Sequence, residues 1–345
     1  MTPRQQLFGD HDDWLAHTLA NADKSTQAAS TRLADGCTVE LLDTGLLELH
    51  PDQQSRHNDL PRLIVSAGVH GNETAPIEVL NALVSELLDG QWSLACPALL
   101  ILGNPPAMAR GERFIDFNLN RLFAGAHQKR PYHDTPEAAR ASQLERLCRQ
   151  FAAASEALVH YDLHTAIRPS EREKFALYPF VPERQVPPEQ CAFLLEAEVD
   201  TLLLQHKTGT TFSSFSSVDL GAESFTIELG KVQPFGHNDL SRFQGIHRAL
   251  RRLLRGEPAP EPAADRQLTE FEVVHEIINS GNQFRFHVPD DVANFTRYPP
   301  GTVIWEDDRN QYQVGESPEA IVFPNRDVPV GQRVGLMVRA RPDAD

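Results

Sequence analysis

The chain has 345 residues, which is long enough for one large domain and a smaller one. Hydrophobic residues make up 41% of it and charged residues 23%, values that exclude disordered, collagen-like and coiled-coil proteins. The 48 acidic residues outnumber the 32 basic ones, so the formal net charge is −16. This charge argues against nucleic acid as a partner, and it requires any site for an anionic ligand to carry local positive charge.

The cysteines and the N-terminus indicate the compartment. None of the four cysteines belongs to a Cys-x-x-Cys pair, so neither a disulfide framework nor a thiolate zinc site is indicated. The first 13 residues are polar, and no apolar stretch is long enough to cross a bilayer. We therefore expect a cytoplasmic protein without a membrane partner. The sequence leaves open whether it forms a homo-oligomer and what residues 1–36 do.

Apolar periodicity predicts the elements of the first 255 residues. Alternating apolar residues predict an early hairpin, continuous apolar runs predict buried strands, and apolar residues every three or four positions predict helices. In chain order these are a hairpin at 37–49, a strand at 62–68, a helix at 74–88, a strand at 98–103, a helix at 136–154, strands at 157–163 and 225–229, and a basic helix at 239–255. Strands that alternate with helices predict an α/β fold, a mostly parallel or mixed sheet with helices on both faces.

A proline-rich stretch at 256–264 divides the chain. Beyond it, residues 270–339 show period-two alternation broken by turn residues, the pattern of an all-β region. We therefore predict an α/β catalytic domain at 1–255, a linker at 256–267 and a smaller C-terminal β-rich domain at 268–345.

Candidate metal ligands follow two of the predicted strands. His70 and Glu73 lie three residues apart in the glycine-containing loop after the strand at 62–68. His164 comes just past the predicted strand at 157–163, and open α/β sheets bind ligands at the carboxyl ends of their strands. His160 is a competing candidate that would lie deeper in its strand. Two histidines and a glutamate are a common zinc ligand set, so the pattern predicts a metal site.

An acidic residue interrupts the apolar strand at 225–229. A carboxylate at such a place is unfavourable unless it faces a cavity, a metal or a partner, and a metal hydrolase needs a carboxylate to move a proton. Glu228 is therefore a candidate general acid/base. The alternative is a buried salt bridge, for which Lys231 is a possible partner.

The loop at 103–121 concentrates arginines and asparagines in an acidic protein. Guanidinium groups bind carboxylates in bidentate fashion and stabilise oxyanions. Because the chain returns Arg113 and Arg121 towards the same sheet edge, we favour a functional role for both; the alternative is a surface position.

Four segments together resemble the succinylglutamate desuccinylase/aspartoacylase family, which is related to the zinc carboxypeptidases. They are residues 68–76, 113–121, 162–168 and 225–231. The resemblance implies a zinc-carboxypeptidase-like sheet and one Zn²⁺ per subunit, with these roles for the site residues: His70, Glu73 and His164 as zinc ligands, Glu228 as general acid/base, Arg113 polarising the scissile carbonyl, and Asn120 with Arg121 holding a substrate carboxylate.

Within the family, segments 72–76 and 162–168 are more similar to bacterial succinylglutamate desuccinylases than to aspartoacylases. The implied reaction is hydrolysis of N-succinylglutamate to succinate and glutamate, the last step of arginine succinyltransferase catabolism. Aspartoacylases place a substrate-binding arginine ten residues before the catalytic glutamate, where this chain has Val218. Arg168 and Lys174 are candidates to bind the third carboxylate of the substrate; the alternative is that both are solvated loop charges.

Other functions stay open at this point. The same chemistry on another acidic N-acyl amino acid such as N-acetylaspartate, a carboxypeptidase, and a non-catalytic binding or regulatory protein with a vestigial metal site are the alternatives. A serine hydrolase is disfavoured because the chain has no G-x-S-x-G elbow. We therefore expect the hydroxyl-rich residues 211–217 to form a polar loop.

Overall fold

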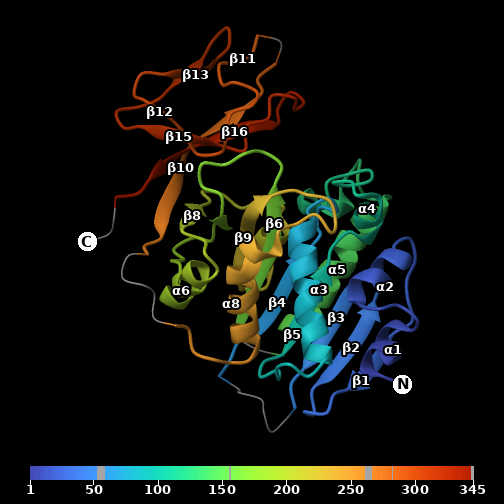
Figure 1. Ribbon diagram of the computed structural model, residues 1–345. Coiled ribbons are helices and arrows are strands. Elements are labelled where there is room, and N and C mark those ends of the chain that lie inside the picture. The colour runs from blue at the N-terminus through green and yellow to red at the C-terminus, as the bar shows by residue number, and fades with distance from the viewer. Residues whose placement is uncertain (53–58, 155–156, 261–265, 282, 343–345) are drawn as a thin grey trace.

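A computed structural model describes residues 1–52, 59–154, 157–260, 266–281 and 283–342 of the chain (Figure 1). A larger part, which carries the N-terminus, combines a sheet with helices, and a smaller β part lies at one end of it (Figure 1). The chain thus has the predicted α/β fold with a smaller C-terminal β region.

One sheet of 13 strands runs through the described residues. Its order is β1 (Ala29–Arg32), β2 (Thr38–Asp43), β3 (Leu46–His50), β5 (Ala98–Leu102), β4 (Arg62–Ala67), β6 (Leu158–Ala166), β9 (Glu223–Lys231), β7 (Phe175–Tyr178), β8 (Thr201–Leu204), β10 (Thr269–Ile278), β16 (Arg333–Ala340), β15 (Glu319–Val322) and β12 (Thr296–Tyr298). The central strands β5, β4, β6 and β9 are parallel, while pairs such as β7 with β9 and β3 with β5 are antiparallel, so the sheet is mixed. The carboxyl ends of the four central strands therefore share one edge.

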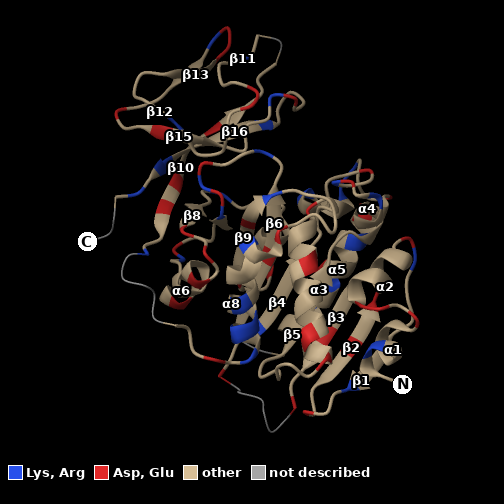
Figure 2. Cartoon of the chain, viewed as in Figure 1, with Lys and Arg blue, Asp and Glu red and all other residues tan. Residues whose placement is uncertain are grey.

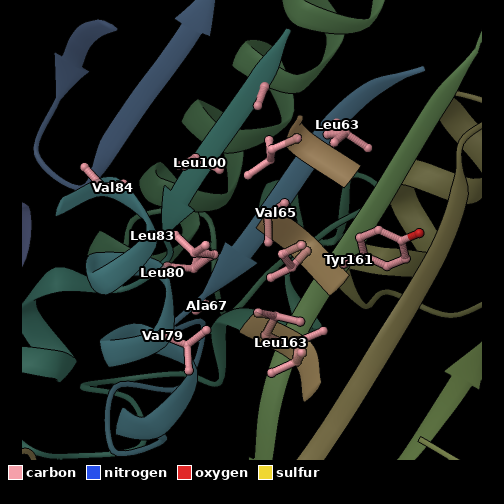
Figure 3. Packing of buried hydrophobic residues seen from close by; sticks show 14 of the residues in the cluster. Leu63, Val65, Ala67, Val79, Leu80, Leu83, Val84, Leu100, Tyr161 and Leu163 are labelled. Carbon is pink, nitrogen blue, oxygen red and sulfur yellow. The ribbon is translucent and has the colours of Figure 1, made fainter. Parts of the chain in front are cut away.

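Helix α3 (Thr74–Leu88) covers one face of the central strands. Figure 3 shows its Leu80 and Leu83 directed at Val65 of β4, with Leu163 of β6 beside them. These side chains belong to one buried cluster that also takes in other helices of this face: α1 (Pro3–Phe8), α2 (Trp14–Ala20), α4 (Pro105–Arg110), α6 (Pro188–Glu196) and α8 (Gln244–Leu254). Because β4 is buried on both faces, its sequence is mostly apolar, with a run at residues 63–65, as expected for an inner parallel strand.

The opposite face packs against α5 (Pro136–Ala152) and α7 (Phe212–Asp219). Alternate residues of β4 and β5, such as Ile64 and Ile101, join Leu144 of α5 and Phe215 of α7 in a second buried cluster. The short 3-10 helices η1 (Leu119–Arg121), η2 (Ala126–Gln128) and η3 (Leu240–Phe243) complete the larger part. Helices thus lie on both faces of the sheet, as predicted, but the predicted polar loop at 211–217 is wrong because α7 is a buried helix.

The C-terminal region continues the main sheet. Strand β10 pairs in parallel with β8 and in antiparallel with β16, which joins the region to the central strands. A second sheet consists of β11 (Arg285–Phe286), β13 (Val303–Glu306) and β14 (Gln311–Gln313). Part of the predicted linker, residues 261–265, lies outside the described residues, and the domain boundaries at 255 and 268 stay a prediction.

Acidic and basic residues are intermixed over the elements (Figure 2). Basic positions of α8 lie beside acidic positions of α3, where Arg251 Nη1 is 3.4 Å from a carboxylate oxygen of Glu86. Within the described ranges, no helix is both long and apolar enough to span a membrane.

Candidate metal centre and active site

The loop after β4 brings His70 and Glu73 together. Glu73 lies directly before the first residue of α3, so the helix fixes the position of its carboxylate. Gly71 between them allows a close approach of α4, because a Cβ atom there would lie 2.2 Å from the carbonyl carbon of Ala107. Gly71 is therefore required by the packing of this loop against α4.

His164 completes the cluster from the neighbouring strand. It lies within β6, which continues to Ala166, so the strand ends three residues later than predicted and the expected position of His164 beyond its end is wrong. The Glu73 carboxylate joins the two imidazoles: Oε1 is 2.8 Å from Nδ1 of His70, and Oε2 is 2.8 Å from Nδ1 of His164. One donor atom from each of the three buried residues lies within 4.8 Å of the others. The spacing suits a single metal ion.

Two further side chains orient the histidine rings. The Oδ1 atom of Asn118 is 3.0 Å from Nε2 of His70, and the Oδ2 atom of Asp162 is 2.8 Å from Nε2 of His164. Metal-binding histidines usually have their second ring nitrogen bonded in this way, which fixes the ring and raises its basicity. The arrangement leaves Nδ1 of both rings directed at the common centre.

The cluster is electrostatically suited to a cation. Burial alone would lower the pKa of His164, but the charges of Asp162 and Glu73 hold it well above its usual value. Burial alone would raise the pKa of Glu73, but the two histidines hold it well below its usual value. Positive charge is thus stabilised between buried carboxylates, and two imidazole nitrogens with one carboxylate match a zinc ligand set. The residues present fit a divalent metal.

His160 belongs to the core and not to this cluster. Its ring nitrogens lie 2.9 Å from the hydroxyl of Ser66 and 2.7 Å from the hydroxyl of Ser216. Burial lowers the pKa of His160 to about 4, so the ring is neutral. The two histidines of the segment 160–168 therefore occupy different environments.

Glu228 and Arg113 lie beside the cluster. Glu228 on β9 is in register with His164 on β6, and its Oε2 atom is buried without a hydrogen-bond partner among the described residues. Burial, and then the negative charge of Glu73, raises the pKa of Glu228 to about 7. Arg113 donates from Nη1 to Oε1 of Glu73 at 2.7 Å, and Gly71 N donates to its carbonyl oxygen at 3.2 Å. A carboxyl group that titrates near neutrality thus adjoins a guanidinium group.

Asn120 and Arg121 lie on η1. The Oδ1 atom of buried Asn120 accepts a hydrogen bond from the backbone N–H of Phe212 at 2.9 Å, which ties η1 to the start of α7. Arg121 donates from Nη1 to the carbonyl oxygen of Asn120 at 3.0 Å. The side chain of Arg121 is accessible to solvent. Desolvation by the surrounding protein, and then repulsion from Arg333 and Arg113, lowers its pKa to about 10.

Arg168 and Lys174 have protein partners elsewhere. Arg168 donates to the carbonyl oxygen of Asp290, and Lys174 bonds the Glu198 carboxylate at 2.8 Å and the carbonyl oxygen of Arg242 at 2.7 Å. In the described part of the chain, neither residue hydrogen-bonds or ion-pairs with the His70, Glu73 and His164 cluster. Their predicted role in substrate binding stays a prediction.

Two orienting residues were not assigned a role from the sequence. Asp162 lies two residues before His164 on β6, and period-two spacing places both on one face of the sheet, which is a readable signal. Asn118 is recognisable only once η1 is seen to fold back onto His70. Asn118 and Asp162 both lie within the family-like segments, and their bonds to the histidine rings give each of them a role.

The fold and the site together define the class of protein. Two histidines, a glutamate and a carboxyl of raised pKa, gathered at one edge of a mixed sheet with helices on both faces, are the components of a metal-dependent hydrolase site. The succinylglutamate desuccinylase/aspartoacylase catalytic domain matches residues 59–254, and the AstE/AspA barrel-sandwich hybrid domain matches residues 266–341. The chain belongs to the succinylglutamate desuccinylase/aspartoacylase family, as the sequence motifs predicted.

Individual relatives resemble the chain over nearly its whole length. A succinylglutamate desuccinylase of Shewanella piezotolerans is 41% identical over 337 residues, covering 96% of this chain and 97% of the relative. The crystal structure of the succinylglutamate desuccinylase from Chromobacterium violaceum is 37% identical with a TM-score of 0.84, covering 97% of this chain and 100% of that one. That of the Vibrio cholerae enzyme is 33% identical with a TM-score of 0.88, covering 97% and 96%.

Proposed function

We propose that the chain is a zinc-dependent amidohydrolase that cleaves N-succinylglutamate into succinate and glutamate. The observation that carries this proposal is the buried cluster of His70, Glu73 and His164 with Glu228 beside it. The desuccinylase of Shewanella piezotolerans, 41% identical over almost the full length of both chains, supports the choice of substrate. The proposal includes a place in the cytoplasm as the last step of arginine succinyltransferase catabolism.

One Zn²⁺ per chain would be held by His70, Glu73 and His164. When bound, zinc supplies a Lewis acid that polarises a carbonyl oxygen and lowers the pKa of water. Asn118 and Asp162 keep the ligand rings in the required orientation through their hydrogen bonds to Nε2 of His70 and His164. These hydrogen bonds hold the ligand atoms in place without a bound metal.

Glu228 is suited to move protons during the reaction. Its raised pKa, about 7, lies near the working pH, where a group can both accept and return a proton. Its unpartnered Oε2 atom leaves one oxygen free to accept the proton of the attacking water and to pass it to the leaving amine of glutamate. A buried carboxylate with a free oxygen is therefore the general acid/base of this proposal.

Arg113 and the η1 residues would bind the charged substrate. Arg113 is about one-third exposed, at 33%, and its guanidinium group lies at the edge of the cluster, where the amide oxygen gains negative charge in the transition state. Arg121 offers a solvent-accessible guanidinium group for a substrate carboxylate, and buried Asn120 holds η1 in place. These cations supply the positive charge that an acidic protein needs at an anion site.

Release of glutamate from N-succinylglutamate, measured beside N-acetylaspartate as the matched alternative, tests the proposed substrate. We expect zinc-loaded protein to cleave the succinyl compound with a kcat/KM at least about 10²-fold higher than the acetyl compound, because the acetyl group lacks the terminal carboxylate. Preferential cleavage of N-acetylaspartate would keep the reaction class and overturn the substrate. Cleavage of neither by zinc-loaded protein would contradict the proposed function.

A further inference from the structure

Two arginines near the site form no ion pair with an acidic residue of the described ranges. In the described part of the chain, the side chain of Arg121 hydrogen-bonds only the carbonyl oxygen of its neighbour Asn120. Arg333, the first residue of β16, is half-buried and pairs through its backbone with β10, but no hydrogen bond or ion pair joins its side chain to another described residue. By contrast, Arg140 donates to three backbone carbonyls and to Gln143. A guanidinium group that protein partly desolvates, and that has no acidic partner, gains from binding an anionic ligand.

The unpartnered arginines also repel each other. Desolvation and then the charges of Arg333 and Arg113 lower the pKa of Arg121 to about 10. Desolvation likewise lowers the pKa of Arg333, against the attraction of Glu276. Glu276 is already engaged by Lys207, and Arg113 is engaged by Glu73. Like charges that collect without an acidic partner mark an anion site.

The position of this pair is adjacent to the proposed metal centre. Asn118, at the start of η1, bonds the ring of His70 at 3.0 Å, and Arg121 is the last residue of the same short helix. Phe123 N, two residues beyond η1, donates to the carbonyl oxygen of Thr210 at 3.2 Å, and Lys207 of the same loop pairs with Glu276 of β10. Arg333 pairs in the sheet with Ile278, two residues after Glu276, so this loop connects η1 to the strand pair that carries Arg333.

We infer that Arg333 is a substrate-binding residue that holds, together with Arg121, one carboxylate of the acidic N-acyl amino acid. The inference rests on the proposed function and deepens it, because it makes β16 a determinant of substrate choice. A carboxylate between two guanidinium groups accepts charge-assisted hydrogen bonds from both and offsets their repulsion. A substrate that lacks that carboxylate would leave both guanidinium groups unpaired and would bind more weakly.

Arg333→Gln tests this contact, with Arg339→Gln as the matched control on the same strand. Arg339 is exposed and pairs with Glu272, away from Arg121. We expect Arg333→Gln to lower kcat/KM for N-succinylglutamate about 10²-fold, mainly through KM, and Arg339→Gln to lower it less than about 2-fold. Arg333→Lys should fall between, since lysine keeps the charge but not the planar fork. Equal rates in wild type and Arg333→Gln would overturn the inference.

Three truncated substrates identify the carboxylate. N-butyrylglutamate lacks the acyl carboxylate, N-succinylglutamine lacks the side-chain carboxylate, and N-succinyl-4-aminobutyrate lacks the α-carboxylate. For one of them the effect of Arg333→Gln should shrink to within about 3-fold, because the partner of the arginine is already missing. An equal loss of kcat/KM on all three substrates would show that Arg333 acts only through the structure and would overturn the inference. A lower melting temperature of Arg333→Gln would show the same, because removing a repelled cation should not destabilise the fold.

Binding separates this inference from the proposed function. In a Glu228→Ala background, calorimetry with N-succinylglutamate should show an about 10²-fold weaker Kd when Arg333→Gln is added. If wild type cleaves N-succinylglutamate and the variant cleaves it equally well, only the inference fails. If wild type cleaves another acyl amino acid instead, the proposed substrate fails, and the same comparison on that compound decides the role of Arg333.

Discussion

Replacing Glu228 with glutamine should make the protein more stable and nearly inactive. The pKa of this carboxyl is raised from 4.5 to about 7 by burial and by Glu73, a shift that corresponds to about 3 kcal/mol of unfavourable free energy for the charged form. Because the folded state holds the proton more tightly than the unfolded state, this destabilisation is absent below pH 4.5, grows as the pH rises and is complete above about pH 7. Glutamine keeps the shape and removes the charge.

Denaturant unfolding of metal-free wild type and Glu228→Gln at pH 5 and pH 8 measures the effect. We expect a gain of up to about 3 kcal/mol at pH 8 and little gain at pH 5. Zinc in the cluster should reduce the gain, because a cation favours the carboxylate. Turnover of zinc-loaded Glu228→Gln should fall about 10²- to 10⁴-fold. A gain that does not depend on pH would refute the account of the raised pKa, and undiminished turnover would remove Glu228 from the mechanism.

Four further outcomes follow from the same structure. In a pH profile, kcat/KM should fall on the acid side with a midpoint between 4.5 and about 7, since Glu228 must lose its proton and bound zinc lowers its pKa; a midpoint above 7 would contradict this. Asp162→Asn should weaken zinc binding about 10- to 100-fold in a chelator competition, and unchanged affinity would deny it an orienting role. Arg113→Gln should lower kcat about 10²- to 10³-fold, whereas a change in KM alone would indicate ground-state binding. Leu80→Ala should lower the free energy of unfolding by about 2–5 kcal/mol by urea denaturation, and a loss below about 1 kcal/mol would show that α3 is loosely packed.

The central α/β elements could be predicted from the sequence because their signals are local. Helix α3 has the predicted limits of 74 and 88, since one apolar stripe faces β4 and Gly90 follows its end. Strand β5 is continuously apolar and β4 mostly so, because both of their faces are covered. Parallel strands then place their carboxyl ends together, so His70 and His164 could be expected at one edge without knowledge of the remaining contacts.

Helix α7 shows where local reasoning fails. Its hydroxyl-rich sequence predicts a polar loop, but its four serines are buried, and all except Ser217 have a hydrogen-bond partner outside the helix. Ser216 Oγ lies 2.8 Å from Ser224 Oγ, and Ser213 Oγ lies 2.7 Å from the hydroxyl of Thr226 on β9. Because buried hydroxyls are tolerated when they are hydrogen-bonded, tertiary context overrides the polarity of the segment.

Long-range pairing is the other part that the sequence could not supply. The pairing of β10 with β8 joins the C-terminal β region to the main sheet, and nothing in either strand specifies the other as its neighbour. The electrostatic interaction of Arg333 with Arg121 depends on that pairing. Nothing in the sequence therefore distinguishes Arg333 from other basic residues. The predicted binding of the third substrate carboxylate by Arg168 or Lys174 stays a prediction.

The central claim is that one metal ion at His70, Glu73 and His164 drives amide hydrolysis, and a zinc titration tests it most directly. Chelator-stripped protein is titrated with Zn²⁺ while glutamate release from N-succinylglutamate is followed, with His164→Ala as the matched variant. The account predicts no turnover without metal, a linear rise that levels off at one zinc per chain, and no recovery in His164→Ala. Full turnover of the stripped protein, or equal recovery in His164→Ala, would contradict it.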